Sequence, residues 1–351
     1  MDAVKSLRDH GVRIGTLQPG RANSIADVSE VSVGHVTVVR DEPDPPDGRG
    51  VARSGVTAVV PEPLATLHAQ PLAAGTAVLN GAGELTGSLQ VAEWGELSTP
   101  VYLTATMSVG RVYDGAVAAA IAADPRMGVD DVVIPMVGEC DDSWLNDARV
   151  VQVEADDVSR ALADAEVAAE VAQGAVGAGA GMVCFDWKGG VGSSSRLTDD
   201  GYALGVLVLA NFGDAPELRV DGVPVGQHLT PGDGGPGPAG SCIAVVATDA
   251  PLSSAQLTRI ARRAGLGLAR TGSVAHHGSG DIFVAFSTDS RGGGSPSLDP
   301  LFQATVEATE EAVLNALWHA ETTTGRDGRV VERLPHEPVL ELLERHGRLR
   351  A

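Results

Sequence analysis

The chain alternates between short apolar runs and segments in which apolar residues recur every three or four positions. The runs are continuous and rich in β-branched residues, a pattern typical of buried strands. We therefore expect strands at Val56–Val60, Val132–Val137, Leu204–Ala210, Ile243–Thr248 and Ile282–Ser287. In the last run Ile282, Val284 and Phe286 fall on one face, because strand side chains alternate. Phe283 and Ala285 fall on the other face.

Helical periodicity is clearest between residues 253 and 268. One helix face is formed there by Leu257, Ile260, Ala261, Ala264 and Leu268. Ser253 followed by Gln256 has the spacing of a capping box, which predicts the start of this helix. Further helices are expected at Ala161–Ala172 and Thr305–Ala320. Since strands and helices interleave without a fixed-period repeat, the pattern predicts an α/β or α+β fold.

Composition and charge narrow the class of protein. The 351 residues are 43% hydrophobic, which suits a globular chain with one large or two smaller domains. The net charge of −21 disfavours binding to nucleic acids or anionic membranes, because like charges repel. Three cysteines, Cys140, Cys184 and Cys242, are too few for a disulfide framework. With no apolar stretch typical of a signal peptide or a membrane span, we expect a cytoplasmic protein.

One segment differs from the rest in composition. Residues 231–240 have the sequence PGDGGPGPAG, and Ser241 follows directly at the start of an apolar run. Glycine and proline at this density are typical of an interdomain linker. The alternative is a strained or mobile loop that presents Ser241 at the first position of a strand.

Common catalytic and metal-binding motifs are missing from the sequence. No GxSxG elbow, Walker A loop or HExxH helix occurs, and the GxGxG at Gly177–Gly181 lacks the spacing of a dinucleotide site. His276, His277 and Asp281 are residue types that bind metals, but adjacent histidines in an extended chain point to opposite faces. We therefore expect neither a metal nor an organic cofactor.

Ser241 can act without a paired histidine if the peptide bond before it is broken. A free α-amine has a pKa of about 7.7–8.0, so a useful share is neutral near neutral pH and accepts a proton. N-terminal nucleophile enzymes use serine, threonine or cysteine in this way. The Ser241 hydroxyl could itself attack the Gly240 carbonyl, shift the acyl group from nitrogen to oxygen and release it to water. Strain stored in the loop would lower that barrier.

Several blocks of the sequence resemble one family. The longest are GSCIAVVATDAPLSSAQLTRIARRAGLGLARTGS at Gly240–Ser273 and GSGDIFVAFST at Gly278–Thr288. Shorter blocks are SGVTAVVP at Ser54–Pro61, NGAGELTG at Asn80–Gly87, GAVGAGAGMVCFDWKGGVGSSSR at Gly174–Arg196, GVLVLANFG at Gly205–Gly213 and LFQATVEATEEAVLNAL at Leu301–Leu317. Running in order from about residue 25 to 330, they resemble the DmpA/BapA group of self-processing aminopeptidases, peptidase class S58.

The resemblance implies a fold and a chain organisation. The fold is a four-layer αββα sandwich of the DmpA/ornithine acetyltransferase type, which is like that of N-terminal nucleophile hydrolases but differs in strand connectivity. Residues 1–351 would form a single domain, with 1–24 as an N-terminal extension. Cleavage between Gly240 and Ser241 would leave an α chain of residues 1–240 and a β chain of residues 241–351. The αβ units would assemble into a tetramer.

The same resemblance implies roles for individual residues. Ser241 corresponds to the family's nucleophile, and Asn211 to the residue whose amide stabilises the oxyanion. Ser279 and Asp281 correspond to a serine–acid pair that positions the nucleophile's α-amine and tunes its pKa. Glu139 is the candidate for binding the ammonium group of a substrate.

Some positions depart from the family pattern. Asp141 stands where some relatives carry a tyrosine near the oxyanion, and an ionised aspartate cannot donate a hydrogen bond. His276 and His277 replace smaller residues, so we expect them to narrow the substrate site or shift its pKa values. Cys242 follows the nucleophile in place of an aliphatic residue and is expected to be buried in the strand.

The predicted function is removal of N-terminal residues from small peptides, amides or esters through an acyl-Ser241 intermediate. The substrates would carry L-residues, D-alanine or β-amino acids. One alternative is hydrolysis of linear amide oligomers, although the nylon-oligomer hydrolases of this group use threonine. Acyl transfer, as in ornithine acetyltransferases, depends on a threonine motif that this sequence lacks. The last alternative is an unprocessed, non-catalytic binding protein.

Overall fold

The structure is a computed structural model that describes residues 5–167, 170–232, 235, 240–289 and 296–350. Its strands are β1 Ser32–Asp41, β2 Val51–Val60, β3 Leu72–Gly81, β4 Glu96–Leu97, β5 Val101–Ala105, β6 Met136–Cys140, β7 Val183–Cys184, β8 Trp187–Lys188, β9 Gly190–Leu197, β10 Ala203–Asn211, β11 Ser241–Thr248, β12 Gly280–Ser287, β13 Thr323–Thr324 and β14 Val330–Val331. Its α-helices are α1 Leu64–Ala69, α2 Ser88–Trp94, α3 Val109–Ala123, α4 Asp156–Val167, α5 Ser254–Arg270, α6 Leu298–Trp318 and α7 His336–Arg345. A short 3-10 helix, η4 Gly177–Gly181, precedes β7.

Most of the strands belong to two sheets. The smaller sheet has the order β1-β2-β5-β6, and the larger has the order β4-β3-β12-β11-β10-β9. Neighbouring strands in both sheets run antiparallel, except for the parallel pairs β5–β6 and β11–β12. The pairs β7–β8 and β13–β14 form separate two-stranded ribbons.

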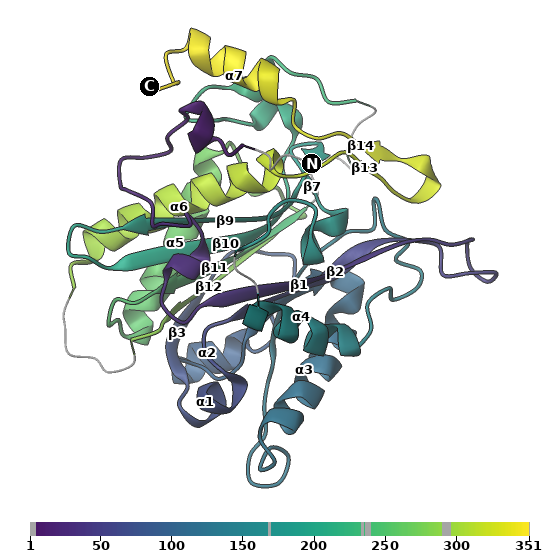
Figure 1. Ribbon diagram of the computed structural model, residues 1–351, viewed down its shortest axis with the longest axis vertical. Helices are drawn as coiled ribbons and strands as arrows, with labels where there is room; N and C mark the ends of the chain where they lie inside the picture. The colour runs from purple at the N-terminus through teal and green to yellow at the C-terminus, as the bar shows by residue number, and fades with distance from the viewer. Residues whose placement is uncertain (1–4, 168–169, 233–234, 236–239, 290–295, 351) are drawn as a thin grey trace.

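Helices cover the outer face of each sheet. α3 and α4 pack on the smaller sheet, whereas α5 and α6 pack on the larger one (Figure 1). The inner faces of the sheets meet in a core cluster that includes Val59, Leu103, Ile243 and Val245. This arrangement is the four-layer αββα sandwich that the resemblance implies, and it confirms the expected α/β class.

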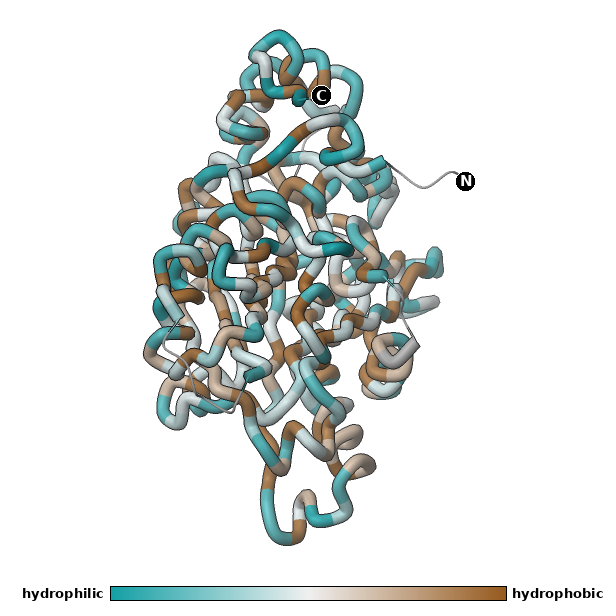
Figure 2. The backbone as a smooth tube through the Cα atoms, turned by 60° about the vertical axis from the view of Figure 1, so that its left-hand side comes forward, coloured by the Kyte–Doolittle hydropathy of each residue, from teal (hydrophilic) through white to brown (hydrophobic). Residues whose placement is uncertain are grey.

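Strand β12 shows how the sequence pattern sets these layers. Ile282, Val284 and Phe286 lie in the core between the sheets. Phe283 and Ala285 lie in the cluster under α5 and α6, as the alternation predicts. Figure 2 shows the same division along the chain, with hydrophobic stretches inside the molecule and hydrophilic ones in many of the outer loops.

Helix α5 begins at the predicted cap. Ser253 is its N-cap, and the Ser253 backbone N–H donates to Gln256 Oε1 at 2.9 Å. The predicted apolar face is buried against the larger sheet and α6: Leu257, Ile260, Ala261, Ala264 and Leu268. The helix predicted at Thr305–Ala320 is α6, which begins earlier, at Leu298, and ends at Trp318.

The strand predicted at Val132–Val137 is wrong in its first half. Strand β6 begins only at Met136, where its pairing with Val101 of β5 starts. Val132 is 76% exposed in the loop between α3 and β6. Pro135 separates the two parts, because proline has no N–H to donate to a ladder.

The helix predicted at Ala161–Ala172 is displaced along the chain. α4 begins at Asp156, where the Asp157 carboxylate accepts the Glu154 N–H at 2.9 Å, and it ends at Val167. Residues 170–172 are not helical, and 168–169 lie outside the described residues. The chain leaves the helix because Val171 and Val176 pack against the core between the sheets.

Residues from the N-terminal extension are part of the packed structure. Leu7, Val12 and Ile14 are buried in the cluster under α5 and α6. Glu311 of α6 lies between two arginines, with Arg8 at 2.5 Å and the fully buried Arg196 at 2.6 Å. Within the described residues, no helix is both long and apolar enough to cross a membrane.

Truncation of a side chain between the sheets tests the packing. Leu207→Ala is expected to lower the free energy of unfolding by about 2–5 kcal/mol, because Leu207 is fully buried and a cavity would remain. The control Leu266→Ala, at a side chain 58% exposed on α5, is expected to change it by less than about 0.5 kcal/mol. Urea unfolding followed by circular dichroism measures both, and equal losses would contradict the assigned core.

Candidate active site

Three residues from adjacent strands meet at one end of the larger sheet. Ser241 pairs with Asn211 across the antiparallel β10–β11 ladder and with Gly280 across the parallel β11–β12 ladder. The Gly280 N–H donates to Ser241 Oγ at 3.2 Å and to the Gly240 carbonyl oxygen, also at 3.2 Å. Ser241 is therefore the first residue of a central strand, as predicted.

Gly240 occupies a position that admits no side chain. A Cβ at this residue would lie 2.0 Å from the Asn211 carbonyl oxygen. Every other residue type would thus push the two strands apart at this rung. The glycine lets the backbone lie directly against the end of β10 at the position where β11 begins.

The Asn211 side chain is held at both ends. Its Oδ1 accepts the Val183 N–H at 2.7 Å, and its Nδ2 donates to the Asp141 carbonyl oxygen at 2.9 Å. These partners define the orientation of the amide, because one is a donor and the other an acceptor. An amide nitrogen carries two hydrogens, so the second N–H of Asn211, a residue that lines the cavity, has no acceptor among the described residues.

Lys188 supports this arrangement from within the protein. The fully buried Nζ donates to the carbonyl oxygens of Gly179, Met182 and Gly189 at 2.9, 2.7 and 2.8 Å. Burial lowers the pKa of Lys188 to about 7. The three bonds tie η4 to the β7–β8 ribbon, which carries the Val183 N–H that holds Asn211.

Ser279 and Asp281 flank Gly280 and contact each other. Ser279 Oγ donates to Asp281 Oδ1 at 2.9 Å, and Asp281 is fully buried. Asp281 Oδ2 finds no donor among the described residues. Burial raises the pKa of Asp281 to about 6, although the Ser279 hydrogen bond and His276 act in the opposite direction. The site thus contains a buried carboxyl group with one free oxygen.

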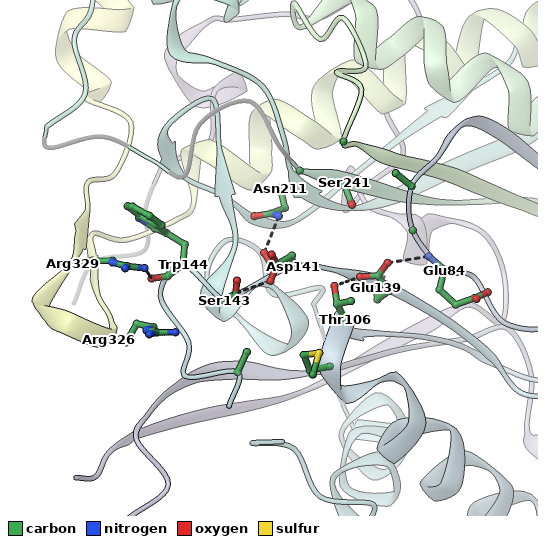
Figure 3. Close-up of a pocket in the computed structure, with 16 residues that line it drawn as sticks. Glu84, Thr106, Glu139, Asp141, Ser143, Trp144, Asn211, Ser241, Arg326 and Arg329 are labelled. Carbon is green, nitrogen blue, oxygen red and sulfur yellow. Dashed lines mark hydrogen bonds between the residues drawn. The ribbon is translucent and has the colours of Figure 1, made fainter. Parts of the chain in front are cut away.

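A cavity of about 890 Å³ opens in front of these residues. Its lining includes Ser241 and Asn211, the acidic residues Glu84, Glu139 and Asp141, and the more distant Trp144, Arg326 and Arg329. Figure 3 shows Ser241 and Asn211 between the glutamates on one side and the two arginines on the other. The volume lies within the range typical of small-molecule sites.

Glu139 is fixed at the end of the cavity beyond Ser241. One carboxylate oxygen accepts the Glu84 N–H at 2.9 Å, and the other accepts the hydroxyl of Thr106. Burial raises the pKa of Glu139, while these two hydrogen bonds act against the rise. A nearly buried carboxylate with a fixed orientation is a suitable partner for a cation in the cavity.

Asp141 contributes through its main chain. Its carbonyl oxygen holds Asn211, and its Oδ1 accepts the Ser143 N–H at 2.9 Å. The side chain lines the cavity, as expected from the sequence. The sequence showed only that Asp141 replaces the tyrosine of some relatives, which concerns the side chain. It did not predict the hydrogen bond from Asn211 to the Asp141 carbonyl oxygen.

His276 and His277 do not line the cavity. His277 is exposed, and His276 Nε2 lies 3.0 Å from Glu217 Oε1. Their expected narrowing of the substrate site therefore stays a prediction, whereas the expected influence on pKa values is seen at Asp281, whose pKa His276 lowers. His276, Glu217 and Asp214 offer ligand atoms within 4.8 Å of one another, a different group from the His276–His277–Asp281 set considered above. The hydrogen bond between His276 and Glu217 accounts for that cluster.

The structure brings Ser241, Asn211, Ser279 and Asp281 together, with Glu139 across the cavity. Sequence reasoning missed Thr106, Trp144, Arg326 and Arg329, which come from three separate segments and belong to no motif. Glu84 lies in the NGAGELTG block, so its neighbourhood was available from the sequence. Cys242 is buried in β11, as expected.

The fold places the chain in the class of proteins built like N-terminal nucleophile hydrolases. Residues 23–331 match Peptidase family S58, and the chain belongs to this family. It is a peptidase of the aminopeptidase type.

Individual relatives resemble the chain over nearly its whole length. It is 40% identical to the beta-peptidyl aminopeptidase BapA of Sphingosinicella microcystinivorans, covering 98% of this chain and 93% of the relative. The crystal structure of the PH0078 protein from Pyrococcus horikoshii OT3 matches at a TM-score of 0.90 and 40% identity, covering 98% and 100% of the two chains. The structure of the L-aminopeptidase D-Ala-esterase/amidase of Ochrobactrum anthropi, described as a variant of the Ntn hydrolase fold, matches at a TM-score of 0.86 and 35% identity. The match covers 98% of this chain and 99% of that chain.

The buried Asp281 predicts a pH dependence of stability. Its folded-state pKa is raised from 3.8 to about 6, so the protonated form is favoured in the fold. The stability that this group contributes is present at low pH and is lost as the pH rises from about 4 to about 6. In a Ser241→Ala background, which removes the neighbouring hydroxyl from both proteins compared, Asp281→Asn is expected to increase stability at pH 7 and change it little at pH 4.

Thermal unfolding of both proteins between pH 4 and pH 8 measures this difference. The control is Asp200→Asn in the same background, because Asp200 is an exposed residue of a surface turn. The difference between Asp281→Asn and its parent should grow with pH, whereas the control should follow the parent. Parallel curves of stability against pH for Asp281→Asn and its parent would contradict the raised pKa of the buried Asp281.

Proposed function

We propose that this aminopeptidase processes itself and uses Ser241, freed by cleavage after Gly240, as its nucleophile. The observation that carries the proposal is the strand register, because it sets Ser241 beside Asn211 and Gly280 at the wall of the cavity. The close passage of Gly240 against the Asn211 carbonyl supports it, since the bond before Ser241 lies within the same site.

Self-cleavage begins with attack of Ser241 Oγ on the Gly240 carbonyl carbon. The new C–O bond forms as the peptide C–N bond breaks, and the hydroxyl proton passes to the Ser241 nitrogen. The Gly280 N–H, 3.2 Å from the Gly240 oxygen, would stabilise the negative charge that develops there. Water then hydrolyses the ester, leaving a carboxylate on Gly240 and a free amine and hydroxyl on Ser241.

The new α-amine would serve as the general base. Asp281 Oδ2, which has no donor among the described residues, is the natural acceptor for a hydrogen bond from this amine. An ammonium beside Asp281 would favour the charged carboxylate, and the carboxylate would raise the pKa of the amine. Ser279 holds the other carboxylate oxygen and so orients the pair.

Peptide hydrolysis would then follow in two steps. The α-amine takes the Ser241 hydroxyl proton while Oγ attacks the substrate carbonyl, and the second N–H of Asn211 faces the resulting oxyanion. The proton passes to the leaving amine as the C–N bond breaks. Water activated by the α-amine then hydrolyses the acyl-Ser241 ester and restores the hydroxyl.

The electrostatics of the cavity suit a substrate with a free amino terminus. Glu139 would bind the ammonium group, and Thr106 together with the Glu84 N–H keeps its carboxylate in place. The substrates we propose are small peptides, amides or esters, and the name of the BapA relative favours N-terminal β-amino acids among the choices. Membership of a peptidase family favours this proposal over a binding protein.

The strand order of the larger sheet explains how the two products of cleavage would stay together. Strands β9, β10 and β3 come from residues 1–240, while β11 and β12 come from residues 241–351 and lie between β10 and β3. Cleavage would therefore leave both products in one single domain of residues 1–351, held by the ladders on either side. The tetramer of αβ units and the cytoplasmic location remain predictions from the sequence.

The mass of the denatured protein tests self-processing. The wild type is expected to give two chains of about 24.5 and about 11.3 kDa, the shares of 240 and 111 residues in 35.8 kDa. The smaller chain should begin with Ser-Cys-Ile, and Ser241→Ala should give one full-length species. The control Ser159→Ala, exposed on α4, should be cleaved like the wild type. An uncut wild-type chain would overturn the proposal.

Replacement of Asn211 tests its role at the oxyanion. In cleaved enzyme, Asn211→Ala is expected to lower kcat about 10²–10³-fold, because one preorganised donor is lost. The unfolding free energy should also fall by about 1–3 kcal/mol, since the Val183 N–H and the Asp141 carbonyl lose their partner. Steady-state kinetics on an aminoacyl p-nitroanilide measures kcat, and urea unfolding measures the stability loss.

A matched control separates chemistry from packing. Asn315→Ala removes another buried amide, whose Nδ2 donates to the Ser193 carbonyl at 2.9 Å away from the cavity. It should lose comparable stability and keep its kcat. Equal kcat values in the two variants would exclude Asn211 from the oxyanion site.

A further inference from the structure

The cavity has charges of opposite sign at its two ends. Glu84 and Glu139 lie on one side of Ser241, and Arg326 and Arg329 lie on the other (Figure 3). The mechanism proposed above uses the acidic end and leaves the two arginines without a role. The nucleophile stands between the ends, so a substrate cut at Ser241 would extend in both directions.

Arg329 is held in a fixed position by Trp144. Its guanidinium carbon lies 4.1 Å from the centroid of the Trp144 ring, and Nη1 donates to the Trp144 carbonyl oxygen at 3.1 Å. Stacking on an aromatic face leaves the edge of a guanidinium free for hydrogen bonds. The Arg329 side chain remains 34% exposed, so the group is both ordered and accessible.

Arg326 points into the cavity and is only partly neutralised. Its Nε lies 3.2 Å from Asp327 Oδ2, which also lies 3.4 Å from Arg329 Nη2. One exposed carboxylate is thus shared by two guanidinium groups. The terminal nitrogens of Arg326 have no acceptor within the part of the chain that the structure describes.

The segment that carries both arginines is fixed to the cavity wall. The Arg326 N–H donates to the Leu145 carbonyl oxygen at 2.8 Å, and Arg53 Nε donates to the Thr324 carbonyl at the same distance. A Cβ on Gly325 would lie 2.4 Å from the Leu145 oxygen, so this glycine permits the close contact. The turn between β13 and β14 is therefore anchored to the wall of the cavity.

We propose that Arg326 and Arg329 bind the C-terminal carboxylate of the substrate's leaving portion. The inference rests on the proposed function, because it needs the ammonium group at Glu139 and the scissile carbonyl at Ser241. A carboxylate fits the free edge of a guanidinium through paired, charge-assisted hydrogen bonds. The preferred substrate class is then a short peptide with a free carboxyl terminus, rather than an amide, an ester or a long chain.

If Arg326 and Arg329 bind the carboxylate, replacing them should remove the enzyme's preference for a peptide with a free carboxyl terminus over the corresponding amide. The probes are β-alanyl-leucine, its C-terminal amide and β-alanyl p-nitroanilide, of which only the first carries a carboxylate. Wild type is expected to show a kcat/KM for the acid at least about 10-fold above that for the amide. The double variant Arg326→Gln/Arg329→Gln should lose about 10–100-fold on the acid, mainly through KM, and stay within about twofold on the other two probes.

Three further variants complete the design. Arg333→Gln is the control, because Arg333 belongs to the same C-terminal segment, pairs with Glu321 and does not line the cavity. It should behave like the wild type on all three probes. Arg326→Gln alone keeps the test available if the double variant fails to fold, and Arg326→Lys should retain part of the acid preference.

The outcomes separate this inference from the proposed function. Hydrolysis of the anilide with no preference of the wild type for acid over amide would overturn the carboxylate site alone. An acid preference that survives in Arg326→Gln and in the double variant would do the same. Failure of the wild type to hydrolyse any of the three probes would overturn the proposed preference for N-terminal β-amino acids, and this inference with it, whereas self-processing is tested separately by the mass of the denatured protein.

Discussion

The site depends on one rung of the larger sheet, where Asn211, Ser241 and Gly280 lie side by side. Strand β11 is paired on both sides, so Ser241 cannot shift without breaking hydrogen bonds to β10 and to β12. The absence of a side chain at Gly240 lets the three strands meet at this rung. The same ladders place the backbone of Asn211 and of Asp281 beside Ser241.

The second sheet supplies the opposite wall of the cavity. Strand β6 approaches β11 closely at Gly138, where a Cβ would lie 3.1 Å from the Ile243 side chain. This approach carries Glu139 and Asp141 to the end of β6 that faces Ser241. Packing of the two sheets therefore determines the distance between Ser241 and the acidic end of the cavity. The burial that results also raises the pKa values of Glu139 and Asp281, so the chemistry of the site follows from the fold.

The sequence predicted the parts of the structure that depend on local pattern. Alternation in β12 placed Ile282 and Phe283 in separate layers, and the capping box placed the start of α5, because both signals extend over a few residues. The pattern failed at residues 132–134, which lie in a loop before β6 that β5 does not pair with. The boundaries of α4 were wrong as well, since the packing of Val171 between the sheets draws the chain out of the helix.

The pattern of the sequence by itself determined the α/β class and the strand that Ser241 opens, and short blocks that resemble one family pointed to Asn211, Ser279 and Asp281. Each of these is encoded by neighbours along the chain. Only the tertiary structure decided that Asp141 holds Asn211 through its backbone, that His276 pairs with Glu217, and that Arg326 and Arg329, far beyond Ser241 in the chain, line the cavity. These contacts join segments far apart in the sequence, and their geometry arises from the packing of the sheets, which no local pattern records.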